Sequence, residues 1–284
     1  MNYGSQSMVG SLKRVIVRKP NSTFGNADPE KWHYVSQPNL EKAIAEHDVL
    51  VKILTDFGSE VIYHEETLPD HSDSIFTHDP VIVGNDGAIL LSMGKPLRVG
   101  EEEAIGKTLE KAGVPIHYRL TGDARAEGGD LLWVDEETLA VGLGFRTNAE
   151  GLRQLQEALP NVNVVPVHLP YFTGPEACLH LMSFISIVDH DKAVVYEELM
   201  PVPFWQDLKA RGFKFAQVPK EEFWTMGPNV LALGPGQCVM LEGNPQTQKN
   251  LVNIGCEVVT YVGKEISLKA EGGATCLTRP ILRE

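Results

Sequence analysis

The sequence predicts a five-bladed α/β propeller, built as a single domain over residues 1–284. A helix-like run followed by a strand-like run recurs five times along the chain. Two β-branched runs joined by a turn precede four of these five pairs. The resulting unit of two strands, a helix and a further strand repeats about every 50 residues, which is typical of radial arrays.

The first helix–strand pair shows the pattern clearly. Residues 40–57 carry Leu40 and Ile44 at helical spacing, and the run stops at Gly58 before the strand-like stretch 60–63. In the other four pairs a Gly or Pro likewise separates the helix from the strand. These pairs are 101–112 with 114–118, 148–159 with 162–168, 205–211 with 213–218, and 247–254 with 257–262.

Four hairpins precede helix–strand pairs, and a fifth is missing from the continuous chain. The four predicted hairpins are 81–91, 131–141, 185–196 and 230–241. We expect the two ends of the chain to supply the fifth, with residues 14–17 pairing against 276–282. This pairing would close the ring and remove exposed sheet edges.

Composition and charge are those of an ordinary globular protein. The chain is 43% hydrophobic and 22% charged, and it contains neither a signal-peptide pattern nor an apolar run of the roughly 18 residues that cross a membrane. We therefore expect a cytoplasmic protein. The formal charge of −13 disfavours nucleic acid and anionic membranes as partners, because both need clustered Lys and Arg. The sequence leaves the oligomeric state open, a homodimer included.

Residues 21–38 form the one long polar stretch rich in Gly and Pro. Such a loop in a compact domain is either a lid over a site or a plain surface excursion. The sequence does not decide between these two interpretations.

The cysteine pattern argues against disulfides, and the Cys and His patterns argue against metal. The chain has four cysteines and nine histidines but neither a CxxC nor an HExxH motif. We expect free thiols and no metal site. The four cysteines are Cys178, Cys238, Cys256 and Cys276.

Four polar residues recur at equivalent places in the repeat. Asp79, Glu127, His180 and Cys276 are separated by 48, 53 and 96 residues, and each stands at or just before the first strand of a hairpin. Gly227 occupies this place in the remaining unit. In a radial fold such positions meet near the axis, so the sequence predicts one shared site.

Local context supports the choice of cysteine and histidine. Cys276 follows two glycines, which allow close backbone approach, whereas the other three cysteines lack this setting and are expected in the core. His180 opens an apolar run at the expected place, whereas His168 ends one. We therefore predict His180 as the site histidine.

Five ordered motifs resemble those of the guanidine-modifying enzyme superfamily, which includes arginine deiminases, dimethylarginine dimethylaminohydrolases and amidinotransferases. The motifs are Phe-Thr-His-Asp (76–79), Glu-Gly-Gly-Asp (127–130), Gly-Phe-Arg-Thr-Asn (144–148), His-Leu-x-Ser (180–183) and Gly-Gly-x-x-Cys (272–276). The resemblance covers essentially the whole chain. That superfamily is built as a five-bladed α/β propeller, which the repeat predicts separately.

The resemblance implies a role for each matching residue and a small cationic guanidine as substrate. Cys276 matches the nucleophile and His180 the general acid and base, while Asp79 and Glu127 match the carboxylates that grip the guanidinium. Arg98 and Arg146 match arginines that hold the substrate carboxylate, Asp73 matches a contact to its α-amino group, and Asp130 orients its neighbours.

The chemistry follows from charge and needs no cofactor. The carboxylates hold the cation, and the cation favours the thiolate of Cys276. Attack of the thiolate on the guanidinium carbon, with His180 protonating the departing amine, leaves a covalent intermediate that water hydrolyses.

One position separates the subfamilies. Arginine deiminases and amidinotransferases typically carry His-x-Asp, whereas this chain has His180-Leu-Met182. Met cannot accept hydrogen bonds from free guanidine nitrogens but suits N-methyl groups, and 284 residues leave little room for the helical insertion of the deiminases. We therefore place a dimethylarginine hydrolase first.

Other functions stay open at this stage. The motifs around Asp79 and Cys276 read more like those of arginine deiminases, so plain arginine or another substituted guanidine is the second candidate substrate. Amidino transfer to an amine is third. Five-bladed propellers also occur as non-enzymatic ribosome-binding factors, but such a binder would need neither this set of side chains nor an acidic charge.

Overall fold

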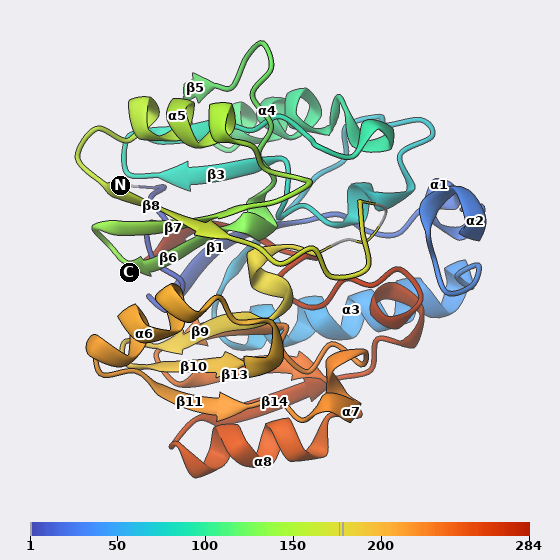
Figure 1. The fold of residues 1–284 in the computed structure, drawn as a ribbon. Helices are drawn as coiled ribbons and strands as arrows, with labels where there is room; N and C mark the ends of the chain where they lie inside the picture. The colour runs from blue at the N-terminus through green and yellow to red at the C-terminus, as the bar shows by residue number, and fades with distance from the viewer. Residues whose placement is uncertain (1, 176, 178) are drawn as a thin grey trace.

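The computed structural model describes residues 2–175, 177 and 179–284. In this part of the chain, fifteen strands form five three-stranded sheets arranged as the blades of an α/β propeller (Figure 1). In each blade the middle strand pairs antiparallel with one neighbour and parallel with the other. The predicted fold class is confirmed.

Four blades are continuous in sequence and contain the four predicted hairpins. Their strands are β3 (Val81–Gly84), β4 (Gly87–Leu90) and β5 (Ile116–Arg119); β6 (Leu131–Asp135), β7 (Thr138–Leu143) and β8 (Asn163–His168); β9 (Ile185–Asp189), β10 (Lys192–Val195) and β11 (Lys214–Gln217); and β12 (Val230–Gly234), β13 (Gln237–Leu241) and β14 (Glu257–Tyr261). The first two strands of each blade are antiparallel because a tight turn joins them. The third is parallel because a helix precedes it.

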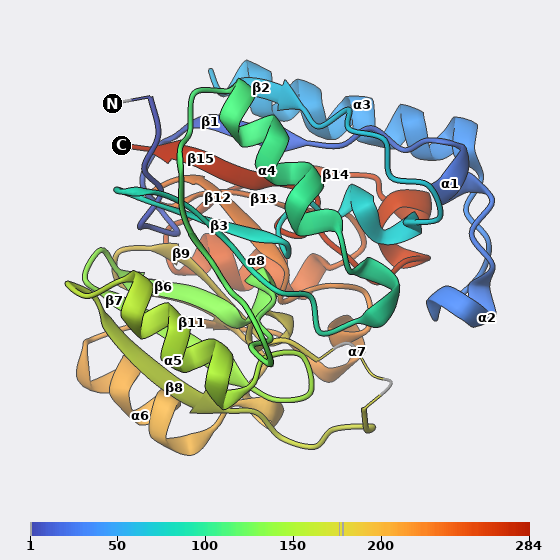
Figure 2. The same cartoon turned by 90° about the horizontal axis from the view of Figure 1, so that it is seen from above.

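The fifth blade joins the two ends of the chain. It contains β15 (Arg279–Arg283), β1 (Leu12–Val17) and β2 (Glu60–Tyr63), in that order. Ile16 lies opposite Arg279 in the antiparallel pair, and Figure 2 shows β1 and β15 side by side. The predicted pairing of the ends is confirmed.

The last strand begins later than the sequence suggested. The expected strand started at Cys276, but β15 starts at Arg279. The backbone N–H of Thr278 donates to the carbonyl of Thr275, so residues 275–278 form a turn instead of pairing with β1. Cys276 therefore lies in a loop ahead of the strand.

Five helices connect the second and third strands of the blades and lie outside the sheets (Figures 1 and 2). They are α3 (Leu40–Asp56), α4 (Glu101–Lys111), α5 (Ala149–Ala158), α6 (Val202–Ala210) and α8 (Pro245–Asn253). α6 starts three residues before the predicted 205, with Pro203 in its first turn, where a missing N–H costs nothing. None of the helices in the described ranges is long and apolar enough to span a membrane.

Three short helices were not predicted, since four residues carry too little periodicity. They are α1 (Ser22–Gly25), α2 (Pro29–Trp32) and α7 (Lys220–Phe223). α1 and α2 lie within the polar segment 21–38. This segment is attached to the body of the protein, because Tyr34 Oη donates to Asp73 at 2.8 Å and Val35 N donates to Lys269 O at 2.8 Å.

The buried faces of the helices and sheets form the core. In α3 the buried residues include Ala43, Leu50 and Leu54, at the spacing of one helix face. Cys238 and Cys256 are buried and carry free thiols, as predicted, and Cys276 is half-buried. Cys178 lies outside the described residues.

The two neighbouring positions 49 and 50 of α3 offer a direct test of this packing. Leu50 is fully buried, whereas Val49 is 50% exposed. We predict that Leu50→Ala lowers the free energy of unfolding by about 2–5 kcal/mol through the lost contacts and the cavity. Val49→Ala should change it by less than about 0.5 kcal/mol. Urea denaturation measures both, and equal effects would contradict this placement of α3.

Candidate active site

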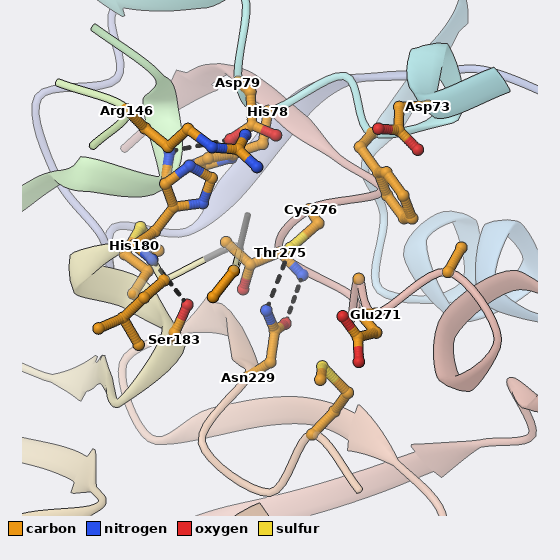
Figure 3. A pocket seen from close by; sticks show the side chains of 18 of the residues that line it. Asp73, His78, Asp79, Arg146, His180, Ser183, Asn229, Glu271, Thr275 and Cys276 are labelled. Carbon is orange, nitrogen blue, oxygen red and sulfur yellow. Dashed lines mark hydrogen bonds between the residues drawn. The ribbon is translucent and has the colours of Figure 1, made fainter. Parts of the chain in front are cut away.

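A cavity of about 250 Å³ brings together the predicted site residues. The residues that line it include Asp73, Asp79, Arg98, Arg146, His180 and Cys276. Figure 3 shows Asp79, Arg146 and His180 on one side, Cys276 in the middle and Asp73 on the other side. Residues more than 200 positions apart meet here. Asp79, His180 and Cys276 precede the first strands of their blades, and the other three lie in segments that connect strands.

Two predicted residues, Glu127 and Asp130, do not line the cavity but lie buried next to it, with no exposed surface. The Glu-Gly-Gly-Asp motif turns tightly just ahead of β6, and Gly128 is needed there because a Cβ would lie 2.2 Å from the carbonyl oxygen of His78. The motif thus places two carboxylates directly behind the cavity wall.

Glu127 holds the site histidine. Its Oε2 lies 2.7 Å from Nε2 of His180 and 3.0 Å from Nη1 of Arg146. Its Oε1 accepts from the backbone N–H groups of Gly94 and Lys95 at 2.8 and 2.9 Å. Burial alone would raise the pKa of Glu127, but the hydrogen bond from His180 and the charge of Arg146 hold that pKa well below its usual range. The ionised carboxylate therefore fixes the orientation of the imidazole.

Of the two carboxylates predicted to grip the guanidinium, Asp79 is the one that lines the cavity. It accepts from Nη1 of Arg98 at 2.6 Å and from the backbone N–H of Gly129 at 3.0 Å. Burial opposes its ionisation, but the charge of Arg98 holds the pKa of Asp79 below its ordinary value. An ionised carboxylate on the cavity wall attracts a cation.

The guanidinium of Arg98 is engaged by the protein itself. Besides its contact with Asp79, Nε and Nη2 donate to Glu101 Oε2 at 3.0 and 2.7 Å, and Nη2 donates to the carbonyl of Phe76 at 2.9 Å. Arg98 thus sits between two carboxylates. This geometry suits support of Asp79 better than direct capture of a ligand.

Asp130 connects the Glu-Gly-Gly-Asp motif to the turn that carries His180. Its two oxygens accept from Thr147 Oγ1 at 2.6 Å and from Leu181 N at 2.9 Å. Burial raises the pKa of Asp130 to about 6. Because Leu181 follows His180, this contact positions the histidine backbone.

The other two histidines considered near the site occupy different environments. His78 lines the cavity, but its Nδ1 is 3.0 Å from the carbonyl of Thr278, and burial lowers its pKa to about 3. His168, at the end of β8, is exposed and does not line the cavity. Of the three histidines, His180 both lines the cavity and contacts the buried carboxylate of Glu127.

Cys276 is half-buried in the turn before β15, and Asn229 reaches its sulfur. Nδ2 of Asn229 donates to Sγ of Cys276 at 3.3 Å. Asn229 is not among the residues predicted from the sequence. The repeat could have found it, because Asn229 directly precedes β12 and Gly227, chosen for that blade, has no side chain.

A cluster of charged residues lies at the far end of the cavity from His180 (Figure 3). Asp73 accepts from Lys95 Nζ at 2.6 Å, and Lys95 Nζ lies 5.1 Å from the ring centroid of Trp32. Glu271 also lines the cavity, and burial raises its pKa. Neither Lys95 nor Glu271 stands in a motif, so the sequence offered no signal for them.

Apolar side chains form part of the remaining wall. Met182, two residues after His180, lines the cavity and is buried. Phe172 stacks on Trp224 with ring centroids 5.6 Å apart, and both rings also belong to the lining. Among the described residues, no group of three or more His, Cys, Asp or Glu side chains is arranged to hold a metal ion.

Comparison with known proteins decides the family. A sequence model described as "N,N dimethylarginine dimethylhydrolase, eukaryotic" matches residues 17–283. The chain belongs to this family. As a member of the dimethylarginine hydrolase family, it is a hydrolase that acts on C–N bonds in linear amidines.

Individual relatives and structures agree with this family. The chain is 31% identical over 279 residues to the uncharacterized protein YkgA of Bacillus subtilis, covering 96% of this chain and 93% of that protein. It is 26% identical over 271 residues to N(G),N(G)-dimethylarginine dimethylaminohydrolase of Pseudomonas aeruginosa, covering 94% and 98%. A mutant of the Pseudomonas aeruginosa enzyme, complexed with citrulline, has the same fold, with a TM-score of 0.80 at 24% identity over 95% of this chain and 99% of that chain.

The glycine beneath the histidine offers a test of the site geometry. A Cβ on Gly129 would lie 2.4 Å from Nδ1 of His180, so Gly129→Ala must displace the imidazole. We predict a fall in kcat of about 100-fold, since a small misplacement of a catalytic group has this effect. Steady-state kinetics with a dimethylarginine substrate measures it.

The matched control is Gly58→Ala, because Gly58 lies at the end of α3 with a φ of 100° and no atom within 4 Å of a new Cβ. This change should lower stability by about 1–2 kcal/mol without changing kcat. A Gly129→Ala enzyme with unchanged kcat would contradict the assigned position of His180.

Proposed function

We propose that the enzyme hydrolyses N-methylated arginine to citrulline and an alkylamine, through a covalent intermediate on Cys276. One observation carries the proposal: Cys276, His180 held by buried Glu127, and ionised Asp79 surround a single cavity that also has Met182 in its wall. These are the groups that cleavage of an alkylated guanidinium requires.

Binding of the substrate rests on charge. The guanidinium is a permanent cation, and Asp79 is the carboxylate that faces it across the cavity. At the opposite end, Lys95 and Asp73 offer one cation and one anion to the carboxylate and amino groups of an amino acid. Arg146, which was expected to hold the substrate carboxylate, lies instead on the wall beside His180 and donates to Glu127 at 3.0 Å, so we assign it to the support of Glu127.

The reaction proceeds in two stages. The thiolate of Cys276 attacks the guanidinium carbon, and His180 donates a proton to the departing alkylamine as its C–N bond breaks. A thiouronium remains on Cys276. Water then loses a proton to His180 and attacks the same carbon. The C–S bond breaks to regenerate the thiolate, and the new hydroxyl group loses its proton to solvent, which releases citrulline. Glu127 contributes by orienting His180 and stabilising its protonated form, as its hydrogen bond to Nε2 supports.

Met182 supports the choice of a methylated substrate. Free guanidine nitrogens carry N–H groups that lose hydrogen bonds when they are buried against a thioether. N-methyl groups in the same place bury apolar surface instead. The buried, cavity-facing Met182 therefore favours methylated over plain arginine. Plain arginine remains the second candidate, because the residues around Asp79 and Cys276 resemble those of arginine deiminases.

A substrate panel tests the proposed function. We predict that citrulline forms from asymmetric dimethylarginine and monomethylarginine with a kcat/KM at least about tenfold above that for arginine, which corresponds to about 1.4 kcal/mol. Product analysis should identify the released alkylamine. Equal or greater activity on arginine would contradict the assignment, and transfer to added glycine or lysine would indicate an amidinotransferase.

Replacement of Met182 tests the specificity argument separately. Met182→Asp supplies a carboxylate for free guanidine N–H groups and removes the apolar contact. We predict that the ratio of kcat/KM for arginine to that for dimethylarginine rises by about tenfold or more, in line with one charged hydrogen bond. Met182→Leu, which keeps the wall apolar, serves as the control and should leave the ratio unchanged. A constant ratio in both variants would show that Met182 does not face the reacting group.

A further inference from the structure

We propose that Asn229 is a further catalytic residue, which holds Cys276 by its sulfur and stabilises the thiolate. The proposal rests on the assignment of Cys276 as the nucleophile. Nδ2 of Asn229 lies 3.3 Å from Sγ of Cys276, so the amide contacts the reacting atom itself (Figure 3).

The orientation of the Asn229 amide is fixed by the loop that carries the nucleophile. Oδ1 of Asn229 accepts from the backbone N–H of Thr275 at 3.1 Å. Because the backbone N–H can only donate, the amide oxygen must face it, and the NH₂ group must face the sulfur. The two hydrogen bonds therefore clamp Thr275 and Cys276 together on one side chain.

The chain makes room for this clamp. Asn229 is only 7% exposed, and a Cβ on Gly273 would lie 2.4 Å from its Oδ1. The second glycine of the Gly-Gly-x-x-Cys motif is thus explained by the close approach of Asn229. The turn has no side chain at residue 273, and this leaves room for the amide beside the sulfur. The contact is therefore a specific feature of the fold rather than a chance surface contact.

A neutral donor at the sulfur suits the chemistry. An N–H group favours the thiolate over the thiol, because the charged form accepts the stronger hydrogen bond. The ionised Asp79 on the same cavity wall opposes formation of a second anion, so a donor at Sγ offsets this repulsion before the cationic substrate arrives. When the sulfur bonds to carbon it loses its charge, and the hydrogen bond weakens. Asn229 therefore stabilises the thiolate before it attacks. It also favours release of the thiolate as the leaving group when the C–S bond of the intermediate breaks.

Asn229 also completes the repeat. Asp79, the Glu-Gly-Gly-Asp motif, His180 and Cys276 come from four of the blades, and Asn229, immediately before β12, comes from the remaining one. Each blade then contributes a side chain from the same end of its first strand to the site.

The pH dependence of Cys276 alkylation by iodoacetamide tests the proposal on the full-length enzyme without any substrate. Mass spectrometry of the peptide that contains Cys276 gives the alkylation rate at each pH. The midpoint of the curve of rate against pH reports the ionisation of the Cys276 thiol. We expect Asn229→Ala to raise the midpoint by about one pH unit, the value of a hydrogen bond to a charged group at a half-buried site. Asn229→Asp, which keeps the shape and the acceptor for Thr275 but adds a negative charge, should raise it further.

Asn244→Asp is the matched control. Asn244 is also buried and bonded to the backbone, through Thr225 O at 2.8 Å, but it does not line the cavity. This variant should lose stability and keep the wild-type midpoint.

An unchanged midpoint in a folded Asn229→Ala or Asn229→Asp enzyme would overturn the proposal. If one of the two variants does not fold, the other is sufficient for the test. Because alkylation reads the thiol directly, this result is independent of the natural substrate. A failed substrate panel with shifted midpoints would overturn the proposed function and leave the role of Asn229 standing.

Discussion

The buried carboxylate of Glu127 is the constraint on which the active site depends. A charge with no exposed surface is tolerated only when surrounding donors satisfy it, and Glu127 has four: the backbone of Gly94 and Lys95, Arg146 and His180. These donors come from three separate loops. One carboxylate thereby fixes the histidine, an arginine and the loop that carries the lysine of the distal cluster.

A second buried charge system places the carboxylate that faces the cavity. Arg98 bridges Asp79 and Glu101, so the positive charge is shared between two acids deep in the wall. The two systems divide the work between them. Asp79 remains ionised toward the cavity, while Glu127 remains ionised behind His180. Both positions follow from the propeller, which brings the strand ends of different blades to one axis.

The sequence predicted the blades well because their signals are local. Glycines such as Gly58 and Gly113 end the helices, β-branched runs mark the hairpins, and these features need no knowledge of the rest of the chain. The eight predicted site residues all lie in or directly behind one cavity. The division between lining residues and buried supports could not be predicted, because it depends on burial. Glu127 was expected to grip the substrate directly. Its contact with His180 depends on the tertiary structure and cannot be read from the sequence.

The same reason explains the residues that were missed. Lys95 is placed at the site by two contacts. Its backbone N–H donates to Glu127, and its amine pairs with Asp73. Asn229 enters because Gly273 leaves it space. Contacts of this kind join residues far apart in sequence. Neither the sequence repeat nor a local motif predicts them.

Turnover by Cys276→Ala, compared with turnover by Cys238→Ala, tests whether Cys276 is the nucleophile. Both substitutions remove a thiol group, but Cys276 lines the cavity and Cys238 lies buried in β13. We predict that citrulline formation falls by about four orders of magnitude or more in Cys276→Ala, as expected on loss of a nucleophile, and is retained in Cys238→Ala. Retained turnover in a folded Cys276→Ala enzyme would contradict it.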